Sequence, residues 1–128
     1  MKKGLIISAL SILLIILVSF IAYQVIDNNL KNLLKQDVSE ISLNKLDDGK
    51  YIGEYQVFPI NVKVEVEVEN HQIKGIVLLK HDNGQGSSAE SIIHSVIVSN
   101  SINVDVISGA SYSSKVILNA ISNALNQK

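Results

Sequence analysis

The longest hydrophobic segment of the chain is an uncharged run from Gly4 to Ile26, preceded by Lys2 and Lys3. A helix rises about 1.5 Å per residue and needs about 20 apolar residues to cross a bilayer, so this run is long enough. Tyr23 lies near its far boundary, where amphipathic aromatic side chains are common. The run is longer than the apolar core of a signal peptide, and no A-x-A-like cleavage site follows it. We therefore expect a retained anchor, with a cleaved signal peptide as the alternative.

Basic residues flank this segment on both sides, Lys2 and Lys3 before it and Lys31 and Lys35 after it. A short basic head directly against the span is typical of a signal anchor with a cytoplasmic N-terminus. We therefore expect a single-pass protein of the cell membrane, held in the lipid bilayer, with its folded domain on the extracytoplasmic side.

These boundaries divide the chain into three regions: a membrane anchor at residues 1–26, a stalk or connector at 27–46, and a folded domain at 47–128. Apolar residues of the second region recur at helical spacing from Leu30 to Ile41, which predicts a stalk that continues the anchor helix. Its charges are mixed rather than basic, which disfavours a helix that lies on the membrane surface.

Alternation with a period of two marks the folded domain most clearly in the segment Val62–Glu69, where valines alternate with charged residues. This pattern predicts a strand with one face on a core and the other in water. The segment Lys50–Val57 predicts a strand before it, and Ile73–Lys80 predicts an antiparallel partner after a turn at Asn70–Gln72.

The rest of the chain has a helical pattern with one short interruption. Ser87 and Glu90 have the spacing of a capping box, and the apolar residues from Ala89 to Ile97 form a helical stripe. Ile102–Ile107 predicts a short strand, and Val116–Leu125 predicts a last amphipathic helix. The fold class is therefore α+β: a small antiparallel sheet with helices packed on one face, preceded by a single N-terminal transmembrane helix.

Composition and charge narrow the chemistry of the domain. The formal net charge of −1 lacks the basic footprint of nucleic-acid binding, so no nucleic-acid partner is expected. The absence of cysteine excludes disulfides, thiolate metal sites and a cysteine nucleophile. The three histidines, His71, His81 and His94, show no metal-ligand spacing, and no serine lies in a G-x-S-x-G elbow. We therefore predict neither a metal site nor a catalytic residue.

The segment VDVISGASYSSK, which begins at Val104, contains a candidate site of another kind. A turn of small residues that leads into a helix directs free N–H groups and the positive end of the helix dipole at one spot, which suits a phosphate. Gly109 and Ala110 allow the backbone to come close. From the residues alone, an ordinary helix cap by Ser111 or Ser113 is the alternative. The hydroxyl donors of the segment belong to Ser108, Ser111, Ser113 and Ser114.

This segment closely resembles the flavinylation motif of the FMN-binding domain family, which includes the C subunit of the sodium-translocating NADH:quinone reductase and the G subunit of the Rnf complex. In the family pattern an aspartate is followed, after two residues, by Ser or Thr, Gly, Ala, and a Thr or Ser whose hydroxyl carries FMN. The resemblance extends from Asp48 to Leu125 and includes the loop HDNGQGSSAESI. Two positions depart from the usual pattern: Ser111 replaces threonine, and Asn100 replaces glutamine.

The resemblance implies a covalent FMN cofactor, bound through a phosphoester. It assigns Asp105 as the motif aspartate and Ser111 as the acceptor. His81, Gly84 and Gly86 follow the predicted hairpin. The resemblance implies that they line the flavin site; the alternative is that they belong to a plain surface loop. The remaining cofactor-binding residues that it implies are Ser108, Gly109, Ala110, Tyr112, Ser113 and Ser114.

The resemblance also implies a function, that of a membrane-anchored electron carrier rather than an enzyme. A separate flavin transferase would move FMN from FAD onto Ser111. The flavin would then pass electrons between membrane redox partners, such as a quinone-linked reductase, and an extracytoplasmic acceptor. The alternatives are a membrane-anchored binding module without a redox role and the flavin subunit of a multi-chain reductase.

Overall fold

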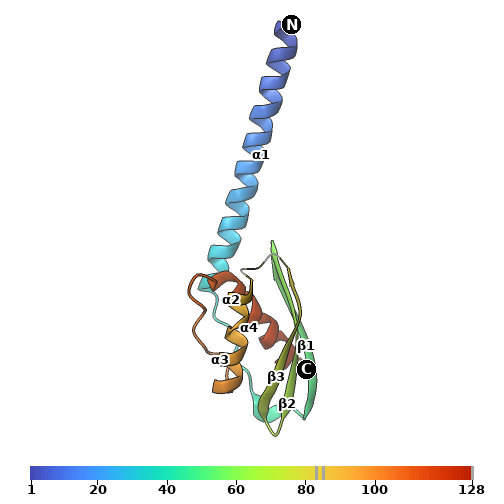
Figure 1. The fold of residues 1–128 in the computed structure, drawn as a ribbon, viewed down its shortest axis with the longest axis vertical. Coiled ribbons are helices and arrows are strands. Elements are labelled where there is room, and N and C mark those ends of the chain that lie inside the picture. The colour runs from blue at the N-terminus through green and yellow to red at the C-terminus, as the bar shows by residue number, and fades with distance from the viewer. Residues whose placement is uncertain (83, 85, 128) are drawn as a thin grey trace.

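The protein consists of one long helix followed by a small α+β domain (Figure 1). The structure is a computed structural model that describes residues 1–82, 84 and 86–127. This architecture confirms the predicted fold class. The elements, in chain order, are α1 (Lys2–Lys35), a 3₁₀ turn (Leu43–Lys45), β1 (Gly49–Val57), β2 (Ile60–Glu69), β3 (Gln72–Asp82), α2 (Ser87–Glu90), α3 (Ile92–Ser99) and α4 (Ser111–Leu125).

Helix α1 is long and apolar enough to cross a membrane, and its large apolar side chains from Leu5 to Val25 are exposed. The helix continues beyond the apolar run, as predicted, but it ends at Lys35 and not near Ile41. The physical reason is docking: Leu33 is 1% exposed and lies in the core of the domain, and the chain becomes extended at Gln36. The predicted helix beyond Lys35 is therefore wrong, although Ile41 still packs on the core from the non-helical connector.

The sheet is antiparallel with the order β1-β2-β3, and the predicted strands agree with it closely. Val62, Val64, Val66 and Val68 are at most 1% exposed, which confirms that the alternating segment turns its valines toward the core. The charged residues between them occupy the opposite face. There Lys50 forms an ion pair of 2.9 Å with Glu65 across the β1–β2 pairing, and this hydrogen-bonded carboxylate raises the pKa of the Lys50 ammonium.

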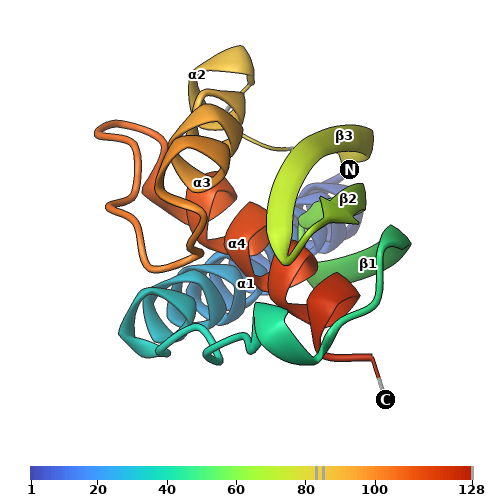
Figure 2. The same cartoon turned by 90° about the horizontal axis from the view of Figure 1, so that it is seen from below.

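Helix α4 packs across the valine face and forms the other half of the core. Figure 2 shows the sheet curving around α4, with α3 on the other side of that helix. The helix begins at Ser111, ahead of the predicted apolar stripe, and its N-cap is Ala110, the last residue of a hydrogen-bonded turn. Its contacts with β1 and β2 are close. The fully buried apolar residues of α4 include Val116, Ile117, Ala120, Ile121 and Ala124.

The segment Ile102–Ile107 forms no strand, so that prediction is wrong. Two backbone N–H groups of this segment donate to side chains and not to a neighbouring strand. The Asn103 N–H donates to Ser101 Oγ at 3.0 Å, and the Ile107 N–H donates to Ser114 Oγ at 3.1 Å. A peptide group that is already bonded gains little from pairing with a sheet edge. The segment therefore crosses the surface as an irregular loop.

The capping box is also wrong. A helix does begin at Ser87, as predicted, but its N-cap is Gly86, and no side chain caps it. The carboxylate of Glu90 pairs with His81 and is not used as a cap. The helical stretch is interrupted at Ser91, which separates α2 from α3.

Gly53 of β1 provides a direct test of the packing between sheet and helix. A Cβ atom at this position would lie closer than 3.0 Å to backbone atoms of Ala120 and Ala124, which cannot move without shifting α4. We expect Gly53→Ala to lower the free energy of unfolding by about 1–3 kcal/mol or more. Guanidinium titration of the full chain in detergent, followed by circular dichroism, measures the change.

Gly75→Ala is the matched control, because it also adds a methyl group within a strand. Its Cβ would come no closer than 3.7 Å, to the flexible Glu67 carboxylate. Equal unfolding midpoints for the two variants would contradict the close packing of β1 on α4.

Candidate functional site

The candidate site is built on a tight turn immediately before α4. The Ala110 N–H donates to the Ile107 carbonyl oxygen at 2.9 Å, which closes a four-residue β-turn. Gly109, the third residue of this turn, has a φ of +79°, a conformation that type II turns require and that glycine adopts without strain. Ala110 is fully buried and is the N-cap of the helix.

Ser114 ties this turn to the first part of α4. Its hydroxyl accepts the Ile107 N–H at 3.1 Å and donates to the Ala110 carbonyl oxygen at 2.7 Å. Both Ser113 and Ser114 are 0% exposed. The two last serines of the motif therefore face the interior, and Ser114 has a structural role in the turn.

Ser111 differs from these two serines in its surroundings. It is the first residue of a 15-residue helix and is half-buried. Among the residues that the structure describes, its hydroxyl has no hydrogen-bond partner, and no side chain caps the helix. The alternative expectation of an N-cap hydroxyl from Ser111 or Ser113 is therefore wrong. Ser111 is thus at the end of α4 where the N–H groups of the first helical turn and the positive end of the dipole lie.

A cleft of about 760 Å³ lies along the same helix. Lys115 follows Ser111 by four residues, so the two side chains share one face of α4, and Lys115 lines the cleft together with Leu118. The opposite walls come from the connector after α1, from the β2–β3 turn, and from the end of α3 with the loop before α4. They include Asp37, Ile41, His71, Asn100 and Val104. The volume is within the range of about 300–1,000 Å³ found for small-molecule sites.

A second, shallower hollow of about 660 Å³ lies on the other side of the loop before α4. Asp105 and Ser108, both exposed, line it together with His94 of α3. Asp105 therefore lies in an irregular loop and not on the strand that we expected there.

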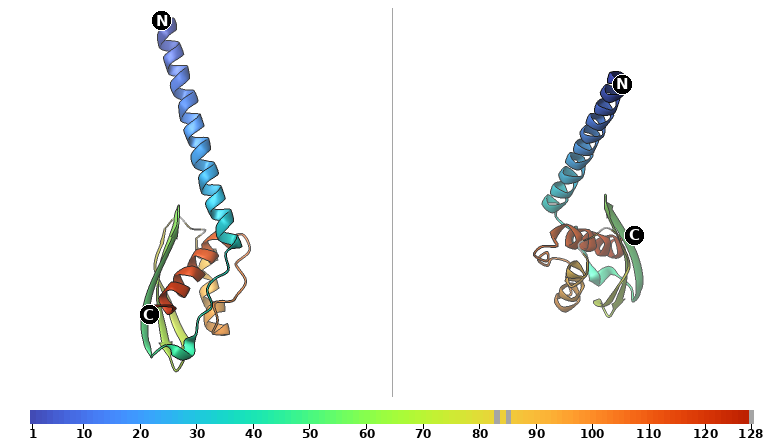
Figure 3. Two further views of the ribbon diagram at one scale, coloured as in Figure 1. Left: turned by 180° about the vertical axis from the view of Figure 1, so that it is seen from behind. Right: turned by 45° about the horizontal axis from the view of Figure 1, so that its top comes forward.

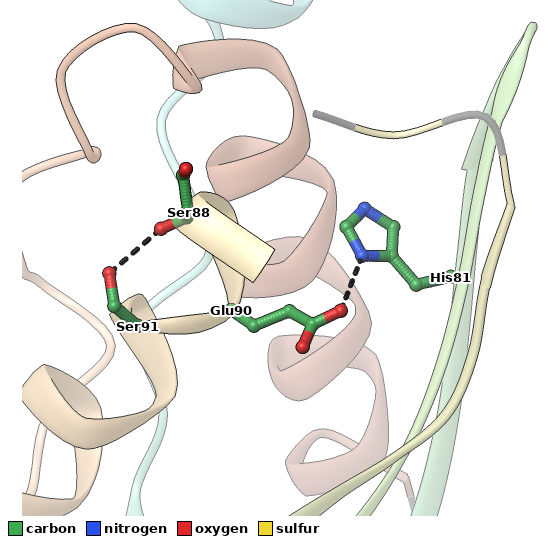
Figure 4. Close-up of polar contacts among 4 residues, drawn as sticks. All are labelled: His81, Ser88, Glu90 and Ser91. Carbon is green, nitrogen blue, oxygen red and sulfur yellow. Dashed lines mark hydrogen bonds and ion pairs between the residues drawn. The ribbon is translucent and has the colours of Figure 1, made fainter. Parts of the chain in front are cut away.

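His81 lies near the end of β3, and its imidazole is only 6% exposed. Its Nδ1 is 3.3 Å from Glu90 Oε1, and Figure 4 shows the two side chains directed at each other from β3 and α2. The Nε2 atom has no hydrogen-bond partner among the described residues. Gly84 packs against this ring so closely that a Cβ there would overlap it, whereas Gly86 has a φ of +70° and open space around it.

The predicted site residues thus fall into two groups. Ser108 to Ser114 form one ordered turn and helix start, in which Tyr112 is half-buried against the core. His81, Gly84 and Gly86 form the other group, and within the described part of the chain no hydrogen bond or ion pair joins it to the first. Gln85, in the middle of the glycine loop, lies outside the described residues.

Sequence reasoning missed Lys115 and the cleft. The spacing of four residues from Ser111 could have indicated Lys115, since it places both on one helix face. The cleft could not be found in this way, because its walls come from segments far apart in the chain.

The chemistry of these residues suits a phosphoester better than a metal. A helix N-terminus, an unengaged hydroxyl and a lysine one helical turn later form a donor set for an anion. Within the residues that the structure describes, no group of three or more His, Cys, Asp or Glu could hold a metal ion. The donor set therefore fits the phosphate of FMN, and the cleft beside Lys115 has room for a flavin ring.

Fold and site together define a small α+β domain that follows a helix long enough to span a membrane and has a turn of small residues at the start of its last helix. Residues 58–126 match the FMN-binding domain, and the chain belongs to this family. The match begins at the β1–β2 turn and includes everything through α4. No curated protein matches the chain.

The double hydrogen bond of Ser114 predicts that this serine stabilises the turn. Ser114→Ala would leave the partly buried Ile107 N–H without its acceptor, so we expect a loss of about 1–3 kcal/mol in the free energy of unfolding. Faster hydrogen exchange of the Ile107 amide, measured by NMR, should accompany the loss. Ser108→Ala is the control: Ser108 is exposed, so this change should stay within about 0.5 kcal/mol. Unchanged exchange in Ser114→Ala would contradict this role.

Proposed function

We propose that the protein is a membrane-anchored electron-transfer protein that carries FMN covalently through a phosphoester to Ser111 Oγ, with its domain on the extracytoplasmic side. Membership of the FMN-binding domain family supports the cofactor. One observation carries the choice of acceptor: Ser111 alone among the serines of the turn combines a helix-start position with a half-exposed hydroxyl that lacks a partner within the described chain. Ser113 and Ser114, by contrast, are fully buried.

Attachment would proceed by transfer of FMN from FAD. Ser111 Oγ attacks the phosphorus atom of the FMN half, the phosphoanhydride bond breaks, and AMP leaves. The hydroxyl proton passes to a base of a separate flavin transferase, because the turn itself offers no base beside Ser111 in the described structure. The N–H groups at the start of α4 stabilise the phosphoester charge by about 0.3–1 kcal/mol.

Lys115 supplies the countercharge in this proposal. Lys115 lies one helical turn beyond Ser111 and lines the cleft. Leu118, Ile41 and Val104 would give the flavin ring apolar contacts inside the cleft. Bound FMN supplies one- and two-electron transfer, while the chain sets its orientation and exposure.

The direction of α4 supports exchange with membrane partners. Figures 1 and 3 show that α4 begins at the end of the domain where α1 joins it. A cofactor at this end would face a quinone-linked reductase in the bilayer, and the protein alone would carry electrons without catalysing a reaction. The basic residues Lys2 and Lys3 support an extracytoplasmic domain.

Co-expression with a flavin transferase tests the attachment. We expect the full chain to show a flavin-fluorescent band on a denaturing gel, and Ser111→Ala to abolish it, because no other serine of the turn offers a free hydroxyl at the helix start. Ser111→Thr is the control and should keep the label. An unlabelled wild-type chain, beside a labelled threonine-bearing relative, would contradict the covalent cofactor. Labelling that survives in Ser111→Ala would place the acceptor at Ser113 or Ser114.

Lys115 gives a second, quantitative test of the same site. A solvent-exposed ion pair is worth up to about 1 kcal/mol, so Lys115→Gln should slow flavin transfer by up to about fivefold. The initial rate of label incorporation measures this effect. Lys115→Arg keeps the charge and should label at close to the wild-type rate; equal rates for the Gln and Arg variants would show that the ammonium has no part in attachment.

A further inference from the structure

Helix α1 is fixed to the domain by side-chain contacts as well as by the chain itself. Leu33 is buried in the core, and Leu30 packs against it. The Tyr55 hydroxyl of β1 donates to Gln36 Oε1 at 3.3 Å, and Ser122 Oγ of α4 donates to the Ser39 carbonyl oxygen at 3.1 Å. The membrane helix therefore sets which end of the domain faces the bilayer.

The end that faces the bilayer includes the β1–β2 turn. In Figures 1 and 3 the tip of this hairpin rises beside the last turns of α1 and is directed to the same side as the N-terminus. The turn consists of Phe58 and Pro59. Phe58 is 61% exposed, whereas its neighbours Val57 and Ile60 pack in the core, so the phenyl ring has no core-packing role.

The depth of this turn follows from helix geometry. The uncharged run of α1 ends at Ile26, and the remaining nine residues to Lys35 extend about 13 Å at 1.5 Å per residue. The headgroup region on each side of a bilayer is about 5–8 Å thick, from a total of 40–45 Å around a core of 30 Å. The headgroup region therefore spans about the first five of these residues, Asp27–Lys31, and the hairpin tip, which rises beside α1 toward the side of the N-terminus, extends toward this level.

We propose that the β1–β2 turn inserts Phe58 into the interface of the leaflet from which α1 emerges. The occupant of this exposed aromatic site is thus the lipid bilayer itself, because the turn is continuous in space with the membrane helix. Aromatic side chains are favoured at this depth. The proposal rests on α1 crossing the membrane, as in the proposed function, and it does not depend on the flavin.

This second contact has a consequence for the candidate site. A domain held by α1 alone could tilt on its connector, whereas a domain held at α1 and at the hairpin has two separate points of attachment. Because α4 begins at the same end, the helix start with Ser111 is held near the membrane surface.

Single-tryptophan fluorescence tests the proposal, since the chain contains no tryptophan. The full chain, made without a flavin transferase, is reconstituted in vesicles of phosphatidylcholine and phosphatidylglycerol with or without brominated acyl chains. We expect brominated lipid to quench Phe58→Trp about twofold, as for a side chain at the interface. Val98→Trp, on the far part of α3 and 71% exposed, is the matched control and should not be quenched.

Tyr23→Trp, within α1, reports on the anchor separately. Quenching of Tyr23→Trp together with an unquenched Phe58→Trp would overturn the proposal while the anchor stands. An unquenched Tyr23→Trp would overturn both. Phe58→Trp emission that is blue-shifted without lipid quenching, and that changes with the protein-to-lipid ratio, would assign the turn to a second copy of the chain and overturn insertion. Failure of Ser111 labelling leaves these readouts unchanged, so the two proposals fail independently.

Discussion

The packing of α4 on the valine face of β2 is the interaction on which the rest of the structure depends. The two surfaces exclude water almost completely, and Gly53 lets β1 approach the backbone of α4. In a domain of this size one such interface supplies most of the apolar burial. It also fixes the position of the site, because Ser111 is the first residue of the buried helix and Lys115 lines the cleft one turn later.

The serines at the start of α4 differ in whether their hydroxyls stabilise the fold or remain available to a ligand. Ser113 and Ser114 lie on the buried side of α4. There the Ser114 hydroxyl forms hydrogen bonds with two backbone groups in place of water. The half-exposed face leaves Ser111 at the helix start. Chemically similar residues within four positions thus have different environments because a helix turns by 100° per residue.

The sequence predicts the parts of this arrangement that follow from local periodicity. The alternation of valines specifies β2 and its buried face, and the apolar run specifies α1, because each pattern depends only on neighbouring residues. The helical end at Lys35 and the partner of the Glu90 carboxylate could not be predicted. Leu33 docks into a core formed by distant segments, and His81 reaches Glu90 of α2 from strand β3. The motif locates the turn, but its hydrogen bonds depend on Ser114 folding back onto Ile107.

The incorrect prediction of a strand at Ile102–Ile107 also bears on the geometry of the candidate site. Periodicity favours a strand there, yet the loop satisfies backbone donors with the hydroxyls of Ser101 and Ser114. A fourth strand would have to run along a sheet edge, away from its present course between the two hollows. In its irregular course the loop lines both hollows: Val104 borders each of them, and Asp105 lines the one beside α3. The segment that stays out of the sheet therefore contributes to both hollows, one of which lies beside Lys115 of α4.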